Sequence, residues 1–160
     1  DGQVTISQNN PTVTLGSNTT FGSGVSLSNA TFPSGHVLKT QMFDSSASIT
    51  QESSGSWTPS ALTSGSFSHG SGNKILIIAV CFMATTNEGW FVRVGGATSG
   101  VELEYYNSSS NSQLDTTTYA FLDSPSGTST TYTVEFRRNS SGTATFYNVS
   151  SKLILMEVKG

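Results

Sequence analysis

The side chains best suited to acid–base or nucleophilic chemistry are few and widely spaced in this sequence. There are two histidines, His36 and His69, and one cysteine, Cys81. Neither histidine has a second histidine or cysteine at metal-ligand spacing, and no G-x-S-x-G nucleophile elbow occurs. Cys81 lies in the most apolar run, which indicates a buried thiol rather than a nucleophile. We therefore expect no catalytic residue, no metal and no cofactor.

Three residues keep an alternative interpretation. On a trimer axis His36 could bind an ion by threefold symmetry, although a hydrogen-bonded histidine is favoured. Glu102 and Glu104 project from one face of a strand, about 7 Å apart by the strand rise. Paired carboxylates can hydrolyse glycosides. Because no other polar groups converge on these two, a solvated strand face is the favoured interpretation.

Surface aromatic side chains form a second candidate site, because they can stack on sugar rings and still present a polar edge. The aromatic candidates are Trp90, Tyr105, Tyr106 and Tyr147. Trp57, by contrast, is expected to pack in the core. The polar stretch 107–113 has the length of a binding loop, and a plain solvated connection remains open for it. We hypothesise receptor binding by Tyr106, Asn107, Asn111 and Gln113.

The composition describes a folded chain with a polar, weakly charged surface. Of its 160 residues, 34% are hydrophobic, 10% aromatic and 11% charged, and the net charge is -3. A disordered chain usually has more charge and fewer aromatics. Arg137-Arg138 is the one basic pair, which argues against nucleic-acid binding. The longest apolar run, residues 75–84, is shorter than the roughly 18 residues of a membrane helix, so no membrane insertion is expected.

The elements that must position these residues are strands. Gly, Pro, Ser and Thr interrupt the chain too often for a helix of three turns, so no significant helix is expected. Alternating or wholly apolar segments separated by turn residues predict an antiparallel β-sandwich of the jelly-roll kind. The predicted strands are 74–83, 90–94, 101–105, 131–137, 143–147 and 152–158.

The first 36 residues differ from the rest and predict a separate N-terminal stalk or arm. A loose repeat of the form V-x-L, polar turn, Phe and Gly-containing turn covers residues 13–24 and 25–35. Such short units cannot form a core alone, but three chains wrapped round one axis can. A flexible Ser/Gly linker is the alternative. We therefore divide the chain into residues 1–36, a β-stalk, and residues 37–160, a jelly-roll head.

The last strand suggests an oligomer. Leu153 and Leu155 point to one side, while Ile154, Met156 and Val158 point to the other. One face should line the core, and a neighbouring subunit would cover the second. The predicted oligomer interface is therefore Ile154, Met156 and Val158.

Several segments, in their order and spacing, resemble the C-terminal region of phage tail-fibre-like and other virion structural proteins, many of them marine. They are Phe32–Leu38, Gly72–Leu76, Ala120–Pro125, Thr131–Val134 and Ser151–Glu157. The resemblance covers about residues 25–160 and departs from the pattern between Thr85 and Asp115. It implies a trimeric jelly-roll head like those of complement and tumour-necrosis-factor domains, with a hairpin at Phe121–Pro125 and no catalytic residues.

Together these features predict a non-enzymatic virion structural protein on the surface of a bacteriophage particle. It would be a homotrimeric fibre or adhesion module that contacts other virion proteins and a host glycan or receptor. The alternatives are a capsid decoration protein, a carbohydrate-binding module and a filament-forming bacterial surface subunit. The chain starts at Asp1 rather than Met and shows no signal-peptide pattern, so we expect a processed product or a fragment of a longer protein.

Overall fold

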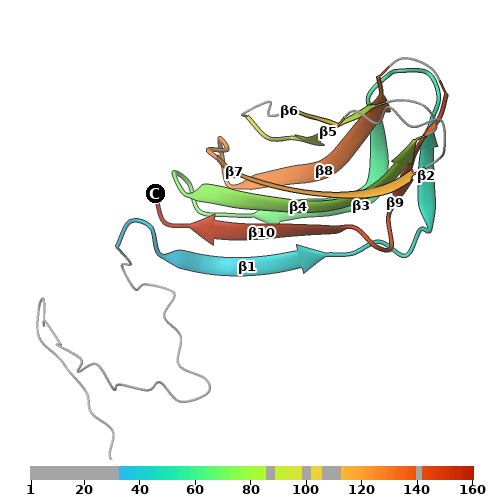
Figure 1. Cartoon of the computed structure of the whole chain (residues 1–160). Helices are drawn as coiled ribbons and strands as arrows, with labels where there is room; N and C mark the ends of the chain where they lie inside the picture. The colour runs from blue at the N-terminus through green and yellow to red at the C-terminus, as the bar shows by residue number, and fades with distance from the viewer. Residues whose placement is uncertain (1–32, 86–88, 99–101, 106–112, 140–141) are drawn as a thin grey trace, which may run out of the picture. The chain divides into compact units, whose positions relative to one another are not determined.

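Strands account for all regular structure in the part of the chain that the computed structural model describes, namely residues 33–85, 89–98, 102–105, 113–139 and 142–160 (Figure 1). All strand pairs are antiparallel, so the all-β prediction is confirmed. The strands are β1 (Val37–Phe43), β2 (Ile49–Glu52), β3 (Thr58–Ser68), β4 (Lys74–Thr85), β5 (Trp90–Gly95), β6 (Glu102–Tyr105), β7 (Gln113–Asp123), β8 (Ser129–Arg138), β9 (Ala144–Tyr147) and β10 (Lys152–Val158).

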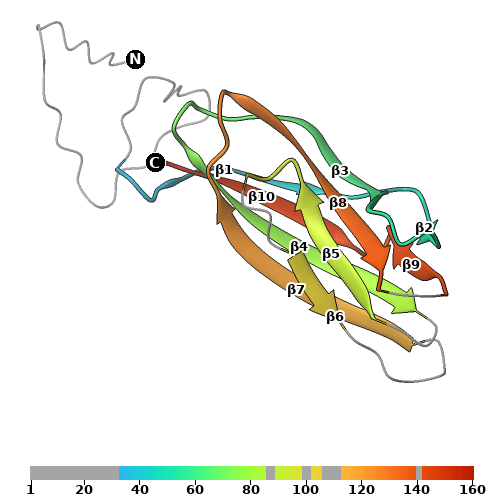
Figure 2. The same cartoon turned by 90° about the horizontal axis from the view of Figure 1, so that it is seen from above.

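The first sheet, sheet A, is organised around β4. One edge of β4 pairs with β7, while β10 and β9 pair with successive parts of its other edge. Beyond them, β1 pairs with β10 and β2 pairs with β9. Sheet A therefore has four strand positions, in the order β1/β2, β10/β9, β4 and β7 (Figure 2).

The second sheet, sheet B, has the order β3, β8, β5 and β6. Alternate residues of the two sheets face each other and form one core, because successive side chains of a strand point to opposite sides. This arrangement is consistent with the predicted β-sandwich. The largest fully buried side chains are Trp90, Tyr132, Phe67, Phe136 and Phe146.

Two ends of the sandwich can be distinguished from the strand register. Val37, the first residue of β1, pairs with Val158, which pairs in turn with Lys74 at the start of β4. Gln113, the first residue of β7, pairs with Thr85 at the other end of β4. The chain therefore enters sheet A at one end, and β7 begins at the opposite end.

Several strands were not predicted from the sequence. β1, β2, β3 and β7 are rich in polar residues, and their apolar positions do not alternate clearly enough to reveal them. The hairpin expected at Phe121–Pro125 is also wrong. β7 and β8 belong to different sheets, so residues 124–128 carry the chain from sheet A to sheet B.

The predicted N-terminal stalk comprises residues 1–36. Its residues 1–32 lie outside the described part of the chain, and all described residues fall in the compact unit Phe32–Gly160. Within the described residues, no helix is long and apolar enough to cross a membrane.

Candidate functional site

The predicted receptor-binding residues are only partly within the described chain. Tyr106, Asn107 and Asn111 lie outside it. Gln113 is the first residue of β7, and only its backbone belongs to the described part. β6 ends and β7 begins at the same end of the sandwich. Tyr105, the last residue of β6, pairs with Trp90 at the start of β5, and Gln113, the first residue of β7, pairs with Thr85 at the end of β4. Recognition by this stretch stays a prediction.

The predictions for both tryptophans are wrong, because Trp90 lies in the core and Trp57 does not. Trp90, proposed as a surface aromatic, is fully buried because it shares the inner face of β5 with Val92 and Val94. Trp57, expected in the core, lies just before β3 and is half-buried among arginines rather than among core residues. Tyr147, another surface candidate, is half-buried on β9.

The outer face of sheet B carries a row of charged side chains from three neighbouring strands. Glu135 of β8, Arg93 of β5 and Glu102 of β6 are successive partners in the register. The Nε of Arg93 donates a hydrogen bond to the Oε2 of Glu135 at 2.7 Å. The Nη1 of Arg93 lies 3.8 Å from the Oε1 of Glu102. The guanidinium is therefore held between two carboxylates.

A second row on the same face combines arginine with aromatic rings. The guanidinium of Arg137 lies 4.0 Å from the ring centre of Phe91, its partner in the register of β8 and β5. Trp57 has the guanidinium carbons of Arg93 and Arg137 at 4.3 Å and 5.1 Å from its ring centre. Such cation–π contacts typically contribute about 0.5–1 kcal/mol each at exposed sites. They help to keep both guanidinium groups on this face of sheet B.

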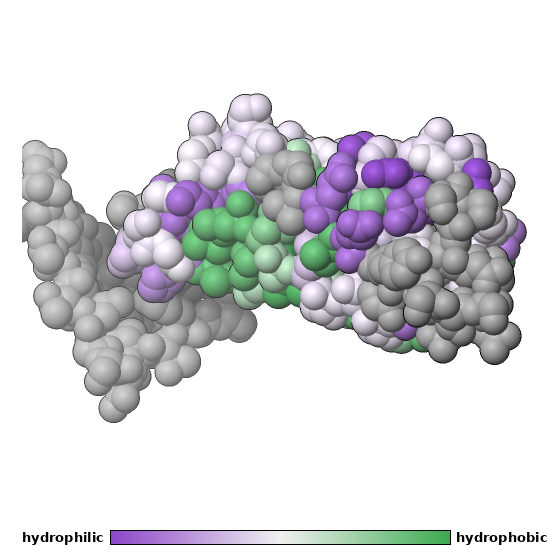
Figure 3. Space-filling view, turned by 45° about the horizontal axis from the view of Figure 1, so that its top comes forward, coloured by the Kyte–Doolittle hydropathy of each residue, from purple (hydrophilic) through white to green (hydrophobic). Residues whose placement is uncertain are grey.

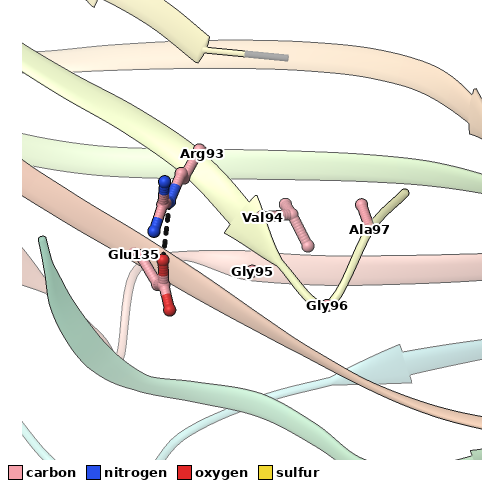
Figure 4. A pocket seen from close by; sticks show the side chains of 6 residues that line it. All are labelled: Arg93, Val94, Gly95, Gly96, Ala97 and Glu135. Atoms are coloured by element: carbon pink, nitrogen blue, oxygen red, sulfur yellow. Dashed lines mark hydrogen bonds and ion pairs between the residues drawn. The ribbon is translucent and has the colours of Figure 1, made fainter. Parts of the chain in front are cut away.

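Next to these rows the surface has an open hollow of about 290 Å³. Figure 4 shows it at the end of β5, with the Arg93–Glu135 pair on one side and the turn after the strand on the other. The carboxylate of Glu135 lies directly over Gly95, since a Cβ there would be 2.6 Å from its Oε1. The residues that line the hollow are Arg93, Val94, Gly95, Gly96, Ala97 and Glu135.

Comparison with known proteins finds no family model and no curated protein that matches the chain. A function has to be inferred from the surfaces of the molecule itself. The hollow beside Arg93 and Glu135 offers a hydrogen-bond donor, an acceptor and a small apolar lining within one shallow space. This combination can bind a small polar molecule.

Sequence reasoning missed this hollow. The alternation within residues 131–137 indicates by itself that Glu135 and Arg137 point outward. The sequence contains no signal that β5 pairs with β8 on one side and with β6 on the other, so Arg93 could not be placed between Glu135 and Glu102. Glu102 and Glu104 do lie exposed on one strand face, as expected. Each has a neutralising or polar partner, and the partner of Glu104 is the side-chain amide of Asn139 at 3.3 Å.

The outer face of sheet A has a different character. Ile154, Met156 and Val158, the predicted interface residues, lie on this face of β10 and are half-buried, while Leu153 and Leu155 of the same strand are fully buried in the core. The register extends the apolar face to β4 and β7, because Met156 pairs with Leu76 and Leu76 pairs with Leu122. In the neighbouring row the partners are Met42, Ile154, Ile78 and Ala120.

Exposed apolar residues mark this sheet at several points. Met42 on β1 is 56% exposed, and Leu122 and Leu114 on β7 are 48% and 61% exposed. Figure 3 shows a different side of the molecule, where apolar residues gather beside a group of strongly hydrophilic ones. Contiguous apolar surface of this kind commonly marks a contact with another protein.

The surroundings of the remaining candidates for chemistry indicate structural roles. Cys81 is fully buried, and burial raises the pKa of its thiol to about 12. His69 is buried and its Nε2 lies 3.1 Å from the Oγ1 of Thr130. His36 is exposed in the segment leading to β1, and its carbonyl oxygen accepts a hydrogen bond from Lys159. Among the described residues, no three metal-ligating side chains gather at one place.

Proposed function

We propose that the chain is a non-enzymatic structural protein of a bacteriophage particle, whose head assembles as a trimer and works as a fibre or adhesion module. The observation that carries the proposal is the apolar outer face of sheet A. A chain with only 34% hydrophobic residues places apolar side chains on both faces of β4 and β10. The inner faces fill the core, and a neighbouring subunit would cover the outer faces.

The arrangement of the strands supports a jelly roll. If β1/β2 and β10/β9 each count as one strand position, the two sheets have four positions each. The chain crosses between the sheets from β2 to β3, from β3 to β4, from β4 to β5, from β6 to β7, from β7 to β8 and from β8 to β9. Two four-stranded sheets connected in this manner are typical of jelly-roll domains. The resemblance to virion structural proteins implies the same kind of head.

The place where the chain enters the head supports a fibre. Residues 33–36 lead into β1 at one end of sheet A, where the backbone amide of Gly35 donates a hydrogen bond to the carbonyl oxygen of Lys159. A particle attached through residues 1–36 would lie on that side. The connections at the other end, where β6 stops and β7 starts, would then face away from the particle and toward a host.

The proposal is tested by measuring the mass of the full chain in solution with light scattering at micromolar concentration. We expect three times the chain mass. Met156→Glu should shift the protein to monomers, because it places a charge among Leu76, Leu122 and Ile154 in the proposed interface. A monomeric parent protein would contradict the trimer.

A matched control separates assembly from folding. Thr131→Glu introduces the same charge on an exposed position of β8, in sheet B, and should leave the trimer intact. Circular dichroism should show strand content for both variants. If Met156→Glu does not fold, Met42→Lys provides a second test of the interface. Met42 is already exposed to solvent, so its replacement cannot disturb the core. A Met42→Lys protein that stays trimeric would contradict the proposed interface.

A further inference from the structure

We propose that the hollow beside Gly95 on sheet B binds one ring of a neutral saccharide. The inference rests on the proposed adhesion function and adds to it a second binding place, on the outer face of a sheet rather than in the stretch 106–113. It follows from the shape of the hollow, from the two polar groups at its side, and from the balance of charge around it.

Two consecutive glycines line the hollow and let neighbouring groups approach the backbone closely. At Gly95 a side chain would meet the carboxylate of Glu135. At Gly96 the backbone has a φ of +88°, and a Cβ would collide with the carbonyl oxygen of Thr131. No ordinary side chain fits at Gly96 without moving the backbone. Since neither position carries a side chain, the hollow is lined there by backbone atoms alone, and it forms a gap in the outer layer of side chains.

The polar groups at the edge of the gap match a pair of neighbouring hydroxyls. Glu135 uses Oε2 to accept the hydrogen bond from Arg93, while its Oε1 lies over Gly95. Among the residues that the structure describes, none donates a hydrogen bond to this Oε1. Arg93 uses Nε for Glu135, so its terminal nitrogens remain as donors. One hydroxyl can donate to Glu135 while the next accepts from Arg93.

The charge around the hollow favours a neutral ligand. Arg93 is the one cation that lines it, and Glu135 and Glu102 flank its guanidinium on both sides. An anion such as a phosphate or a sialic acid would approach two carboxylates for each guanidinium, which is electrostatically unfavourable. A cationic ligand would have to compete with the guanidinium of Arg93, which already pairs with both carboxylates. Hydroxyl groups bind to both partners without this penalty.

The size of the hollow restricts the ligand to a single ring. Its volume of about 290 Å³ is at the lower limit of ordinary small-molecule sites. Ala97 and the glycine backbone form a small apolar part of the lining against which C–H groups of a ring can pack. A shallow site with two hydrogen-bonding side chains binds weakly. In a trimer three copies act together, and multivalent attachment would raise the apparent affinity by orders of magnitude.

The test uses the full chain, neutral hexoses and N-acetylhexosamines as probes, and saturation-transfer NMR as the readout. Gly95→Ala should abolish the signal, because the methyl group displaces the carboxylate of Glu135 and fills the gap. Its backbone φ lies outside the left-handed region, so alanine is compatible with the strand. Glu135→Gln should weaken binding at least tenfold. Glu102→Gln is the matched control, since it neutralises the other carboxylate beside Arg93 but does not line the hollow.

Three outcomes are distinguishable. Sugar binding that is lost in Gly95→Ala and Glu135→Gln but kept in Glu102→Gln supports the proposal. A parent protein that gives no signal with any neutral sugar, or one that gives equal signals for all variants, overturns it. If the chain is trimeric and adheres to host cells in either of these last cases, the adhesion function stands and recognition lies elsewhere. A monomer that does not adhere to cells contradicts the proposed function itself.

Discussion

The hydroxyl of Tyr132 donates a hydrogen bond to the Oδ2 of Asp123 at 2.9 Å, and both residues are fully buried. Tyr132 lies on β8 in sheet B, while Asp123 ends β7 in sheet A. The Oδ1 of the same carboxylate accepts a hydrogen bond from the backbone amide of Thr98 at 2.8 Å. One buried side chain therefore connects both sheets and the turn after β5.

Replacement of Asp123 by alanine should destabilise the protein by about 1–3 kcal/mol or more, because the hydroxyl of Tyr132 and the amide of Thr98 lose their acceptor inside the protein. Tyr132→Phe should cost less, since Asp123 keeps its bonds to Thr98. Urea unfolding measures both changes. Asp44→Ala is the control, because Asp44 pairs with Lys152 at the surface and such pairs contribute about 1 kcal/mol at most. Equal losses for Asp123→Ala and Asp44→Ala would contradict this account.

Two glycines with similar backbone angles should respond differently to alanine. Gly96 and Gly127 have φ values of +88° and +82°, so alanine is strained at both by about 1–2 kcal/mol. A Cβ at Gly127 meets nothing within 4 Å, whereas one at Gly96 meets the backbone of Thr131. Gly96→Ala should therefore lower the melting temperature clearly more than Gly127→Ala. If the two variants melt together, the turn after β5 is not as closely packed against β8 as described.

The thiol of Cys81 should not react in the folded protein. Burial raises its pKa from 9.0 to about 12, so little thiolate forms at pH 8 and the reagent has no access. Ellman's reagent should label less than a tenth of the native protein in the time that it labels the urea-unfolded chain completely. Rapid labelling of the native protein would show that β4 opens readily.

The same thiol should make stability depend on pH in alkaline solution. A folded pKa above the unfolded one stabilises the protein fully below pH 9, and this contribution is lost as the pH rises toward 12. The slope can reach about 1.4 kcal/mol per pH unit. Burial also raises the pKa of Tyr119 and Tyr132, which adds to the loss above pH 10. Cys81→Ala should reduce the pH dependence of the urea midpoint between pH 9 and 10. An unchanged slope would contradict this assignment.

The stretch that follows β6 offers a separate test of receptor binding. The double variant Tyr106→Ala and Asn107→Ala should keep the melting temperature of the parent while host-cell binding falls. The cell adhesion of the Glu135→Gln variant is measured in parallel, so that the two proposed places of recognition can be compared. Adhesion that persists in the double variant would remove the stretch 106–113 from the recognition surface.

The sequence by itself determined the fold class and the best-patterned strands. The last strand, Lys152–Val158, has the predicted bounds, and β4 begins at Lys74 as predicted. These predictions depend on a period of two residues, which is a local property of the chain. The inward direction of Leu153 and Leu155 followed from the same alternation, and so did the buried state of Cys81 from its apolar surroundings.

Only the tertiary structure decided which strands are neighbours. Hydrogen bonding between strands joins residues far apart in the sequence, and no local pattern specifies the partner or the register. The pairing of β5 with β8 and β6 brings Arg93 between Glu135 and Glu102 and opens the hollow above Gly95. It also decides that Trp90 faces the core and Trp57 the arginines, because burial depends on what covers a strand face and not on the residue type alone.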